Sequence, residues 1–427
     1  MSSPLLRARA NTAFQILKEA IPAVLEEKIP ADSFLARKFK LNKQFGSRDR
    51  RFIRDIVFVW FRWRGLILEH LPEEPEPSPR GILCALLADG APADLLEMWA
   101  DWGGLAPETV FAAAEGDSLP EKIHRFTGKP VDPLCVLPEW SREKLDPRFA
   151  EWYQKRPTLW LRANCGDLRE RLAENGIEIT PHETIRNAYR CENRDVNLYQ
   201  LPEYRDGLFE VQDFSSQCIG LAASPSAGEI WLDSCAGAGG KTLQLLSMLN
   251  GKGRVVSSDV SERRMEELGK RVSRCGWKVS TEVHDLTQPL PKRLWGRFDG
   301  VLTDAPCSSS GRWRRNPELR WQSSPEQVRK YSELQMKILE NVSKAVKPGG
   351  YLIYATCSAF PEENEKQIEN FLNFHFDFEL DEKWCILPNS KMSGMLRVSP
   401  WDADCDASFA ARLRRKELPE DALPPQP

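Results

Sequence analysis

Apolar residues at helical spacing dominate the first third of the chain. Residues 5 to 27 and residues 48 to 70 each place apolar side chains three or four positions apart, as an amphipathic helix requires. These side chains are Leu6, Ala10, Phe14, Leu17, Ile21 and Val24 in the first segment, and Phe52, Ile56, Val59, Trp60 and Trp63 in the second. An acidic, proline-rich stretch, "PEEPEPSPRG" (72–81), interrupts the pattern, which then continues to about residue 130. We therefore expect residues 1–130 to form an all-α domain.

The character of the sequence changes after residue 130. Short runs rich in β-branched and aromatic residues, "TLWLRAN" (158–164), "GIEITPHET" (176–184) and "GLFEVQDFSS" (207–216), predict strands. A Ser/Pro/Gly segment, "ASPSAGE", follows near residue 225. Residues 131–225 are therefore expected to form a small α+β domain.

From residue 229 onward, β-like runs alternate with helical runs. The β-like runs are "IWLDSC", "RVVSSDV", "KVSTEVHD", "FDGVLTDAP" and "YLIYATCS", and the helical patterns cover 240–249, 261–275, 325–347 and 361–374. This alternation predicts an α/β domain with a doubly wound, mostly parallel sheet over residues 226–418. Ligands of such sheets bind beyond the carboxyl ends of the strands. The last residues, "PEDALPPQP" (419–427), predict a disordered tail.

The charge is distributed unevenly along the chain. The net charge of -3 combines +7 in the first 70 residues with -10 in the remainder. A basic N-terminal face attracts a polyanion such as a nucleic acid, but it also fits a solvated helix surface. Charge alone leaves both interpretations open.

Cysteine spacing and hydropathy exclude several classes of protein. The eleven cysteines are scattered singly, without a CxxC pair, so we expect no metal site and no disulfide framework. The first residues lack the apolar core of a signal peptide, and no run approaches the roughly 18 apolar residues that a membrane span needs. We expect a soluble, cytoplasmic protein.

The segment "LDSCAGAGGKT" (232–242) joins a predicted strand to a predicted helix, where glycines let the backbone approach a ligand. A P-loop, GxxxxGK[ST], would need glycine at the position of Cys235. The dinucleotide fingerprint is GxGxxG, whereas Gly237, Gly239 and Gly240 give GxGG, which matches it only in part. A helix cap without a ligand is the third reading.

Carboxylates at the ends of the following strands favour a ligand. Asp259 ends the second strand of this domain, where a carboxylate accepts both hydroxyls of a ribose. Asp285 ends the third, within reach of an adenine amino group, and Asp304 ends the fourth. Each could be a helix cap, but capping alone does not explain why they share one sheet edge with the glycine loop. S-adenosylmethionine, which carries adenine, ribose and an amino acid, needs this spread of contacts.

Two cysteines end strand-like runs about fifty residues apart, in "DAPCSSSGRWRRNPELRW" (304–321) and "YLIYATCS" (351–358). Together with "DSCAGAGGKT" and the "PEENE" that follows, these motifs resemble the Sun-type, RsmB-like family of RNA cytosine-5 methyltransferases over residues 150 to 415. More weakly, "FGSRDRRFIRDIVFVWFR" resembles the NusB-like helical domain that precedes the catalytic part of RsmB-like members. The alternative for both cysteines is structural burial at strand ends.

The resemblance implies a Rossmann-like methyltransferase sheet that uses S-adenosylmethionine. It implies that Cys357 is the nucleophile, that Cys307 assists proton removal and release, and that Asp304 holds the cytosine edge and supplies the proton or hydrogen bond. Cytosine-5 methyltransferases of DNA instead use the cysteine of the Pro-Cys motif, which here would be Cys307, but the paired cysteine of "TCS" favours RNA. It also implies a cofactor site formed by Cys235, Ala236, Gly237, Ala238, Gly239, Gly240, Lys241, Asp259, Asp285 and Asp304.

The segment after Cys307 is rich in arginine and tryptophan. Phosphate contact or stacking on RNA is expected of Arg312, Arg314, Arg315 and Arg320. Surface ion pairs are the alternative for these arginines, and Trp313 and Trp321 fit either base stacking or core packing. The NusB-like segment favours ribosomal RNA over transfer RNA as substrate. Two rival functions are a non-catalytic RNA-binding assembly factor and a P-loop NTPase.

Overall fold

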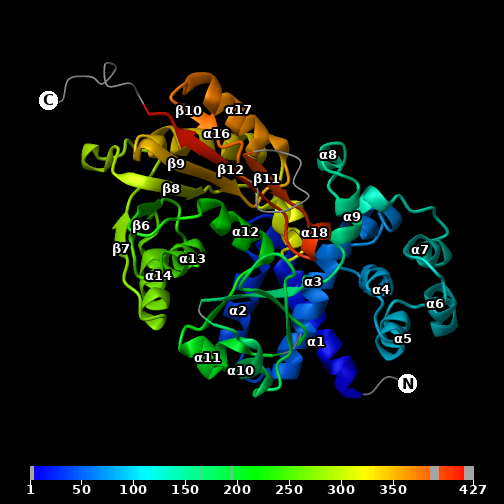
Figure 1. Ribbon diagram of the computed structural model, residues 1–427. Coiled ribbons are helices and arrows are strands. Elements are labelled where there is room, and N and C mark those ends of the chain that lie inside the picture. Colours follow the sequence, from blue (N-terminus) through cyan, green and yellow to red (C-terminus); the bar gives the residue numbers. More distant parts are fainter. Residues whose placement is uncertain (1–3, 165, 194–195, 385–393, 418–427) are drawn as a thin grey trace. The chain divides into compact units, whose positions relative to one another are not determined.

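The structure is a computed structural model that describes residues 4–164, 166–193, 196–384 and 394–417 (Figure 1). The chain divides into two compact units. One comprises the residues up to Arg156 together with Arg312–Pro325, and the other comprises Pro157–Gly311 together with the residues from Glu326 onward. The tail expected at 419–427 lies outside the described residues.

The described residues of the first unit form helices only. These are α1 (Pro4–Leu25), α2 (Ala31–Leu41), α3 (Ser47–His70), α4 (Pro79–Ala88), α5 (Ala93–Trp102), α6 (Pro107–Ala114), α7 (Leu119–Thr127), η1 (Pro133–Val136), α8 (Glu139–Arg142), α9 (Arg148–Trp152) and α15 (Glu318–Gln322). Helices α1 and α3 match the two predicted amphipathic segments, and Leu17, Ile56 and Trp60 of their apolar stripes are buried. The helical unit runs on to Arg156, past the boundary expected at residue 130, because η1 packs against α3 and α9.

The segment 312–325 belongs to the helical unit rather than to the second unit, which precedes and follows it in the chain. Arg320 of α15 is completely buried there. Its guanidinium donates hydrogen bonds of 2.9–3.3 Å to four main-chain carbonyl oxygens, those of Arg62, Val136, Tyr153 and Trp313. Burial lowers the pKa of Arg320 to about 9. This arginine therefore holds helices of the unit together.

Replacing Arg320 by methionine is expected to lower the free energy of unfolding of the helical unit by about 3 kcal/mol or more. The substitution leaves buried carbonyl oxygens without the charged donor that satisfies them. Urea unfolding measures the change, with Arg329→Met as the control because Arg329 is exposed and pairs with Glu333 at the surface. Equal stability of the two variants would contradict this role of Arg320.

The second unit begins with a small antiparallel sheet. Its strands are β1 (Leu159–Ala163), β2 (Ile179–Pro181), β3 (Ala188–Cys191) and β4 (Phe209–Val211), in the order β2-β3-β1-β4. The short helices α10 (Arg169–Ala173), η2 (Leu198–Gln200) and α11 (Pro202–Arg205) complete this small α+β part. All three strand-like runs of the sequence lie in this sheet, and β3 is an addition to them.

The large sheet has the order β10-β12-β9-β8-β5-β6-β7, and β11 also pairs with β12. Its strands are β5 (Ile230–Asp233), β6 (Arg254–Asp259), β7 (Ser280–Val283), β8 (Phe298–Asp304), β9 (Val346–Thr356), β10 (Phe378–Leu380), β11 (Met395–Val398) and β12 (Ser408–Arg415). Strands β5 to β9 pair in parallel, and the last three strands pair antiparallel. The doubly wound, mostly parallel sheet predicted from the alternating pattern is confirmed, with an antiparallel extension.

Helices cover both faces of this sheet (Figure 1). They are α12 (Phe214–Ala223), α13 (Gly240–Leu249), α14 (Glu262–Arg274), α16 (Pro325–Ser343) and α17 (Glu365–Phe374). The shorter helices η3 (Lys292–Leu294), η4 (Ser310–Arg312), η5 (Pro361–Glu363) and α18 (Pro400–Ala403) lie in the connections. Leu339 of α16 and Phe371 of α17 lie in the core of one face, whereas Ile219 of α12 and Leu245 of α13 lie in the core of the other. The fold is therefore a three-layer α/β arrangement.

Candidate active site

The chain order reverses at β5, which pairs with β6 on one side and with β8 on the other. In open parallel sheets, such a switch point leaves a crevice beyond the carboxyl ends of the two central strands. The glycine loop follows β5, Asp304 ends β8, and Cys357 directly follows β9. The sequence motifs thus meet at the edge where this fold binds its ligands.

Two glycines give the loop after β5 its shape. Gly237 and Gly239 have positive φ angles of 54° and 88°. A Cβ added at Gly239 would lie 2.8 Å from Cγ of Leu268, so the loop packs closely on α14 at that point. A Cβ at Gly237 or Gly240 would meet no atom within 4 Å. The loop therefore has open space above Gly237 and the first residue of α13, which suits a bound nucleoside-like group.

The two carboxylates expected to face ribose and adenine differ in their surroundings. Asp259 is buried and accepts hydrogen bonds of 2.9 Å from the backbone N–H groups of Gly237 and Ser261. Asp285 is exposed and accepts from the N–H and hydroxyl of Thr287, which lower its pKa. Asp259 is thus tied to the glycine loop. The expected ribose contact of Asp259 and adenine contact of Asp285 stay predictions.

Asp304 forms an ion pair with a lysine that the motif placed in the cofactor loop. Nζ of Lys241 lies 2.6 Å from Oδ2 of Asp304 and 3.1 Å from Oγ of Ser216. Burial by itself lowers the pKa of Lys241, but the adjacent carboxylate of Asp304 more than offsets this and the pKa is raised overall. Lys241 is therefore a charged partner of Asp304 at the strand end, a pairing that the sequence motifs did not reveal.

The two cysteines lie next to each other. Sγ of Cys307 is 3.4 Å from Sγ of Cys357, and Sγ of Cys357 is 3.6 Å from Oγ of Ser309. Cys307 is buried and Cys357 is partly exposed. The hydrogen bond with Cys357, together with burial, raises the pKa of Cys307 well above its usual range. The geometry therefore provides a pair of interacting thiols, one of which is open to an incoming group.

Gly311 lets the two cysteine loops approach. Its N–H donates to the carbonyl oxygen of Cys357 at 2.9 Å, and its own carbonyl accepts from the N–H of Ala407 at 3.0 Å. A Cβ at this position would lie 2.1 Å from the carbonyl oxygen of Ala407. Glycine is therefore required where the loop after β8 crosses the end of β9.

Asp233 at the end of β5 was part of the quoted loop but was not predicted as a site residue. It is completely buried, and its Oδ2 accepts a hydrogen bond of 2.6 Å from the Thr242 hydroxyl. Burial raises its pKa from 3.8 to about 7. An aspartate at the end of a buried parallel strand is the sequence signal that could have identified it.

Between pH 4 and pH 7 the folded chain holds a proton on Asp233 that the unfolded chain has lost. Stability therefore falls as pH rises through this window. Asp233→Asn is expected to remove this pH dependence. The free energy of unfolding of the variant should therefore rise, relative to that of the original chain, by on the order of 2–4 kcal/mol between pH 4 and pH 8. Urea unfolding of both proteins across this range measures the difference, and a constant difference would contradict the assignment.

The four arginines expected to contact RNA lie in different surroundings. Arg314 is 1% exposed and donates to two main-chain carbonyl oxygens at 2.6 and 3.0 Å, and Arg320 is buried as described above. Because their guanidinium groups face the interior, burial removes these two from the expected RNA contacts. Trp313 is also completely buried. Arg312 is exposed and Arg315 is partly exposed, and RNA contact by these two stays a prediction.

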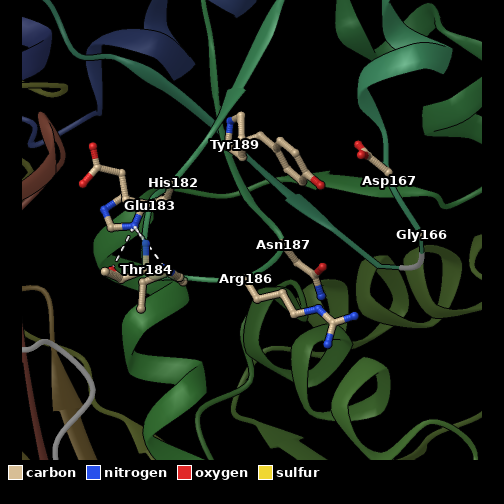
Figure 2. A pocket seen from close by; sticks show the side chains of 10 residues that line it. Gly166, Asp167, His182, Glu183, Thr184, Arg186, Asn187 and Tyr189 are labelled. Atoms are coloured by element: carbon tan, nitrogen blue, oxygen red, sulfur yellow. Dashed lines mark hydrogen bonds between the residues drawn. The ribbon is translucent and has the colours of Figure 1, made fainter.

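A separate cavity of about 560 Å³ lies on the small α+β part, beside Asp167, His182, Arg186 and Tyr189 (Figure 2). Nδ1 of His182 accepts hydrogen bonds from the backbone N–H groups of Thr184 and Ile185, at 3.2 and 3.1 Å. That ring nitrogen therefore shapes the loop. None of the predicted site residues lines this cavity.

Comparison with known proteins identifies the family. Residues 221–414 match the family model described as 16S rRNA methyltransferase RsmB/F. Ribosomal RNA small subunit methyltransferase B of Escherichia coli (strain SMS-3-5 / SECEC) is 35% identical over 297 residues, which cover 67% of this chain and 68% of that protein. The chain belongs to the RsmB/F methyltransferase family. The protein of the same name from Pasteurella multocida is 32% identical over 65% of each chain.

Solved structures agree with the RsmB/F assignment at the level of the fold. The crystal structure of PH0851 has a TM-score of 0.74 at 24% identity and covers 97% of this chain and all of that one. A methyltransferase homologue from Pyrococcus horikoshii has a TM-score of 0.54 at 26% identity, covering 73% of this chain. The RsmB-like family, the Rossmann-like fold and S-adenosylmethionine as methyl donor, all expected from the motifs, are confirmed. The NusB-like character of the helical unit stays a prediction.

The structure adds two findings about this RsmB/F-family chain. Among the described residues, no group of three or more His, Cys, Asp or Glu side chains is arranged to hold a metal ion. No described helix is long and apolar enough to cross a membrane. The family assignment makes the chain an RNA methyltransferase.

Proposed function

We propose that this protein transfers a methyl group to carbon 5 of a cytosine in RNA through a covalent bond between Cys357 and carbon 6. One observation carries the proposal: the thiols of Cys307 and Cys357 lie 3.4 Å apart at the edge where Lys241 and Asp304 also meet. A methyltransferase that acts on an exposed oxygen or amino group has no use for paired thiols. Methylation of a ring carbon needs one thiol as the nucleophile and a second group to help release it.

Carbon 5 of cytosine is a poor nucleophile, so the protein must activate it. Addition of the Cys357 thiolate to carbon 6 moves the ring electrons toward carbon 5, which can then form the new carbon–methyl bond. Cys357 fits this role because it is the partly exposed member of the pair. The cytosine must leave its stack before a sulfur atom can approach the face of the ring.

Asp304 and Lys241 are placed to hold the cytosine edge during this addition. The carboxylate of Asp304 accepts from the exocyclic amino group, and the ammonium of Lys241, bonded to it at 2.6 Å, is the adjacent proton source for the ring nitrogen. Protonation or hydrogen bonding there withdraws electrons from carbon 6 and favours attack by sulfur.

Cys307 completes the reaction. After methylation, carbon 5 must lose its proton and carbon 6 must release sulfur. The Cys307 thiol can give its proton to the departing sulfur of Cys357 and take the carbon-5 proton in return, which restores the ring double bond. The ring nitrogen returns its proton to Lys241, and Cys357 loses its new proton to solvent and becomes the thiolate again. The 3.4 Å separation of the two sulfur atoms suits this exchange.

The glycine loop and the strand-end carboxylates are the proposed cofactor site. Residues 235–241, Asp259 and Asp285 would hold S-adenosylmethionine, whose sulfonium supplies an electrophilic methyl group. The open space above Gly237 and Gly240 and the link from Gly237 to Asp259 support this placement. Asp304 would lie next to the methyl group.

Ribosomal RNA of the small subunit is the proposed substrate, with transfer RNA as the alternative. The relatives from Escherichia coli and Pasteurella multocida are named for methylation of that RNA. Arg312 and Arg315 are the proposed phosphate contacts of the segment after Cys307.

Nucleoside mass spectrometry tests the proposed function. Purified protein is incubated with S-adenosylmethionine and either small-subunit ribosomal RNA or transfer RNA. The expected result is 5-methylcytidine in the ribosomal RNA, located at a single cytosine by bisulfite sequencing. Methylation of another atom or base would overturn the chemistry, methylation of transfer RNA alone would change the substrate, and RNA binding without any methylation would favour an assembly factor.

A further inference from the structure

A buried carboxylate links the two cysteine loops. Glu363, at the end of η5, is completely buried. Its Oε1 accepts from the backbone N–H of Ser308 at 2.8 Å, and its Oε2 accepts from the hydroxyls of Ser308 and Ser358, both at 2.5 Å. Ser308 directly follows Cys307, and Ser358 directly follows Cys357. One carboxylate therefore contacts the neighbour of each thiol.

The same carboxylate is connected to the other side of Cys307 through Gln335. Nε2 of Gln335 donates to Oε1 of Glu363 and to the carbonyl oxygen of Pro306, both at 3.0 Å. The hydroxyl of Tyr354 donates to the main-chain oxygen of Glu363 at 2.7 Å. The loop carrying Cys307 is thus held both before and after the thiol.

The hydrogen-bond donors around Glu363 favour its ionised form. The N–H of Phe360 donates to the Ser358 hydroxyl, and the N–H of Ala359 donates to the Ser310 hydroxyl, at 3.1 and 2.8 Å. The hydroxyls of Ser308 and Ser358 are then free to direct their protons to Glu363. Two N–H groups and two hydroxyls thus surround the carboxylate, and hydrogen bonds to the charged form stabilise it. Burial raises the pKa of Glu363, and these donors oppose that rise.

We propose that Glu363 is a positioning residue for the two-cysteine reaction. Its buried carboxylate fixes the loops of Cys307 and Cys357 at one separation, and its negative charge keeps the proton of the thiol pair on Cys307, so that Cys357 is the thiolate that attacks. This inference rests on the proposed function and assigns the difference between the two thiols to a third residue, in the "PEENE" motif.

The charged groups around the thiol pair agree with this assignment. The pKa of Cys307 is raised by its hydrogen bond with Cys357, by burial and by the charge of Glu363. The other titratable groups that interact with Cys307 are the hydroxyls of Tyr331 and Tyr354, which are neutral at physiological pH. The positive charge of Lys241 interacts with Cys357 instead. The charge of Glu363 therefore acts on Cys307, whereas Lys241, which is paired with Asp304, acts on Cys357.

Site-resolved alkylation tests the inference without RNA or cofactor. The full-length protein is treated with iodoacetamide from pH 6 to pH 10, and mass spectrometry measures the rate at each cysteine. In the original chain, Cys357 is expected to react first. In Glu363→Gln, the ratio of the alkylation rate at Cys357 to that at Cys307 should fall at least tenfold. The pH at which the Cys307 rate reaches half its maximum should move to a lower value. Glu369→Gln removes the same charge from an exposed position of α17 and should change neither value.

A second variant separates charge from shape. Glu363→Asp keeps the charge but shortens the side chain, so the Cys357-first order should persist while the rate of methylation falls at least tenfold. If Glu363→Gln does not fold, loss of the Cys357-first order in Glu363→Asp would overturn the role of the charge. A folded Glu363→Gln with the original preference would overturn it too. Absence of methylation by the original chain, with the expected alkylation order, would refute the proposed function and leave the positioning intact.

Discussion

Cys307→Ala is expected to trap the protein on its RNA as a covalent adduct, whereas Cys357→Ala is expected to form no adduct and no product. Without the Cys307 thiol, Cys357 can still add to carbon 6 and the methyl group can still transfer. Proton loss from carbon 5 and release of sulfur then lose their nearest acid and base. General acid–base groups typically contribute a factor of about 10² to 10⁴ to a rate, so release should become slower than formation of the adduct.

Denaturing gels of each variant with RNA and S-adenosylmethionine show the adduct as a shifted protein band. Cys218→Ala is the matched control, because Cys218 is a buried cysteine of α12 that contacts the sheet core. It should methylate RNA and give no shifted band. An adduct from Cys357→Ala and none from Cys307→Ala would reverse the roles of the two thiols.

Lys241→Met is expected to reduce the methylation rate by about 10²-fold or more. The substitution removes the ammonium 2.6 Å from Asp304, and with it the charge that pairs with this partly exposed carboxylate and the proposed proton source for the cytosine ring. Loss of a single pre-organised electrostatic contact typically costs a factor of roughly 10² to 10³ in kcat. Single-turnover rates at saturating RNA and cofactor measure the effect on the chemical step.

The other end of β8 offers the control for this substitution. Lys347 pairs with Asp299 at 2.8 Å, and its side chain is 40% exposed. Lys347→Met therefore removes a similar ion pair from the same strand at the edge away from the site. Its rate should remain within about twofold of the original, as for surface ion pairs in general. Equal losses in the two variants would mean that Lys241 acts only through the stability of the fold.

The meeting of the two cysteines follows from features that can be predicted from sequence. Cys307 and Cys357 are fifty residues apart, but each follows a strand of the alternating α/β pattern. Strands β8 and β9 pair in parallel, with Thr303 opposite Tyr354, so their carboxyl ends lie at the same edge. A strand period, a parallel sheet and the position of each cysteine after its strand were therefore enough to bring the thiols together.

The antiparallel extension could not be predicted in this way. Strand β12, "SFAARLRR", has the alanine and arginine content of a helix, and six of its eight residues are buried without alternation. It becomes a strand because it pairs with β9 on one side and with β10 and β11 on the other. Tertiary pairing thus overrides local propensity, and no local signal reports it.

The arginines after Cys307 show a second limit of sequence analysis. Arg312, Arg314, Arg315 and Arg320 are chemically alike, but Arg314 and Arg320 are buried and bind main-chain carbonyl oxygens. A guanidinium satisfies carbonyl groups as well as phosphates, so its partner depends on burial, which the sequence does not display. Glu363 was hidden for a similar reason, because an acidic motif such as "PEENE" resembles a solvated turn.

The most direct test of the account uses RNA in which cytidine at the methylated position is replaced by 5-fluorocytidine. Fluorine cannot leave carbon 5 as a cation, so the methylated adduct of the unaltered protein should not break down. After nuclease and protease digestion, mass spectrometry should find the modified pyrimidine, carrying one added methyl group, on the peptide that contains Cys357. A methylated pyrimidine attached to the Cys307 peptide, or the absence of any adduct where normal RNA is methylated at carbon 5, would contradict the account.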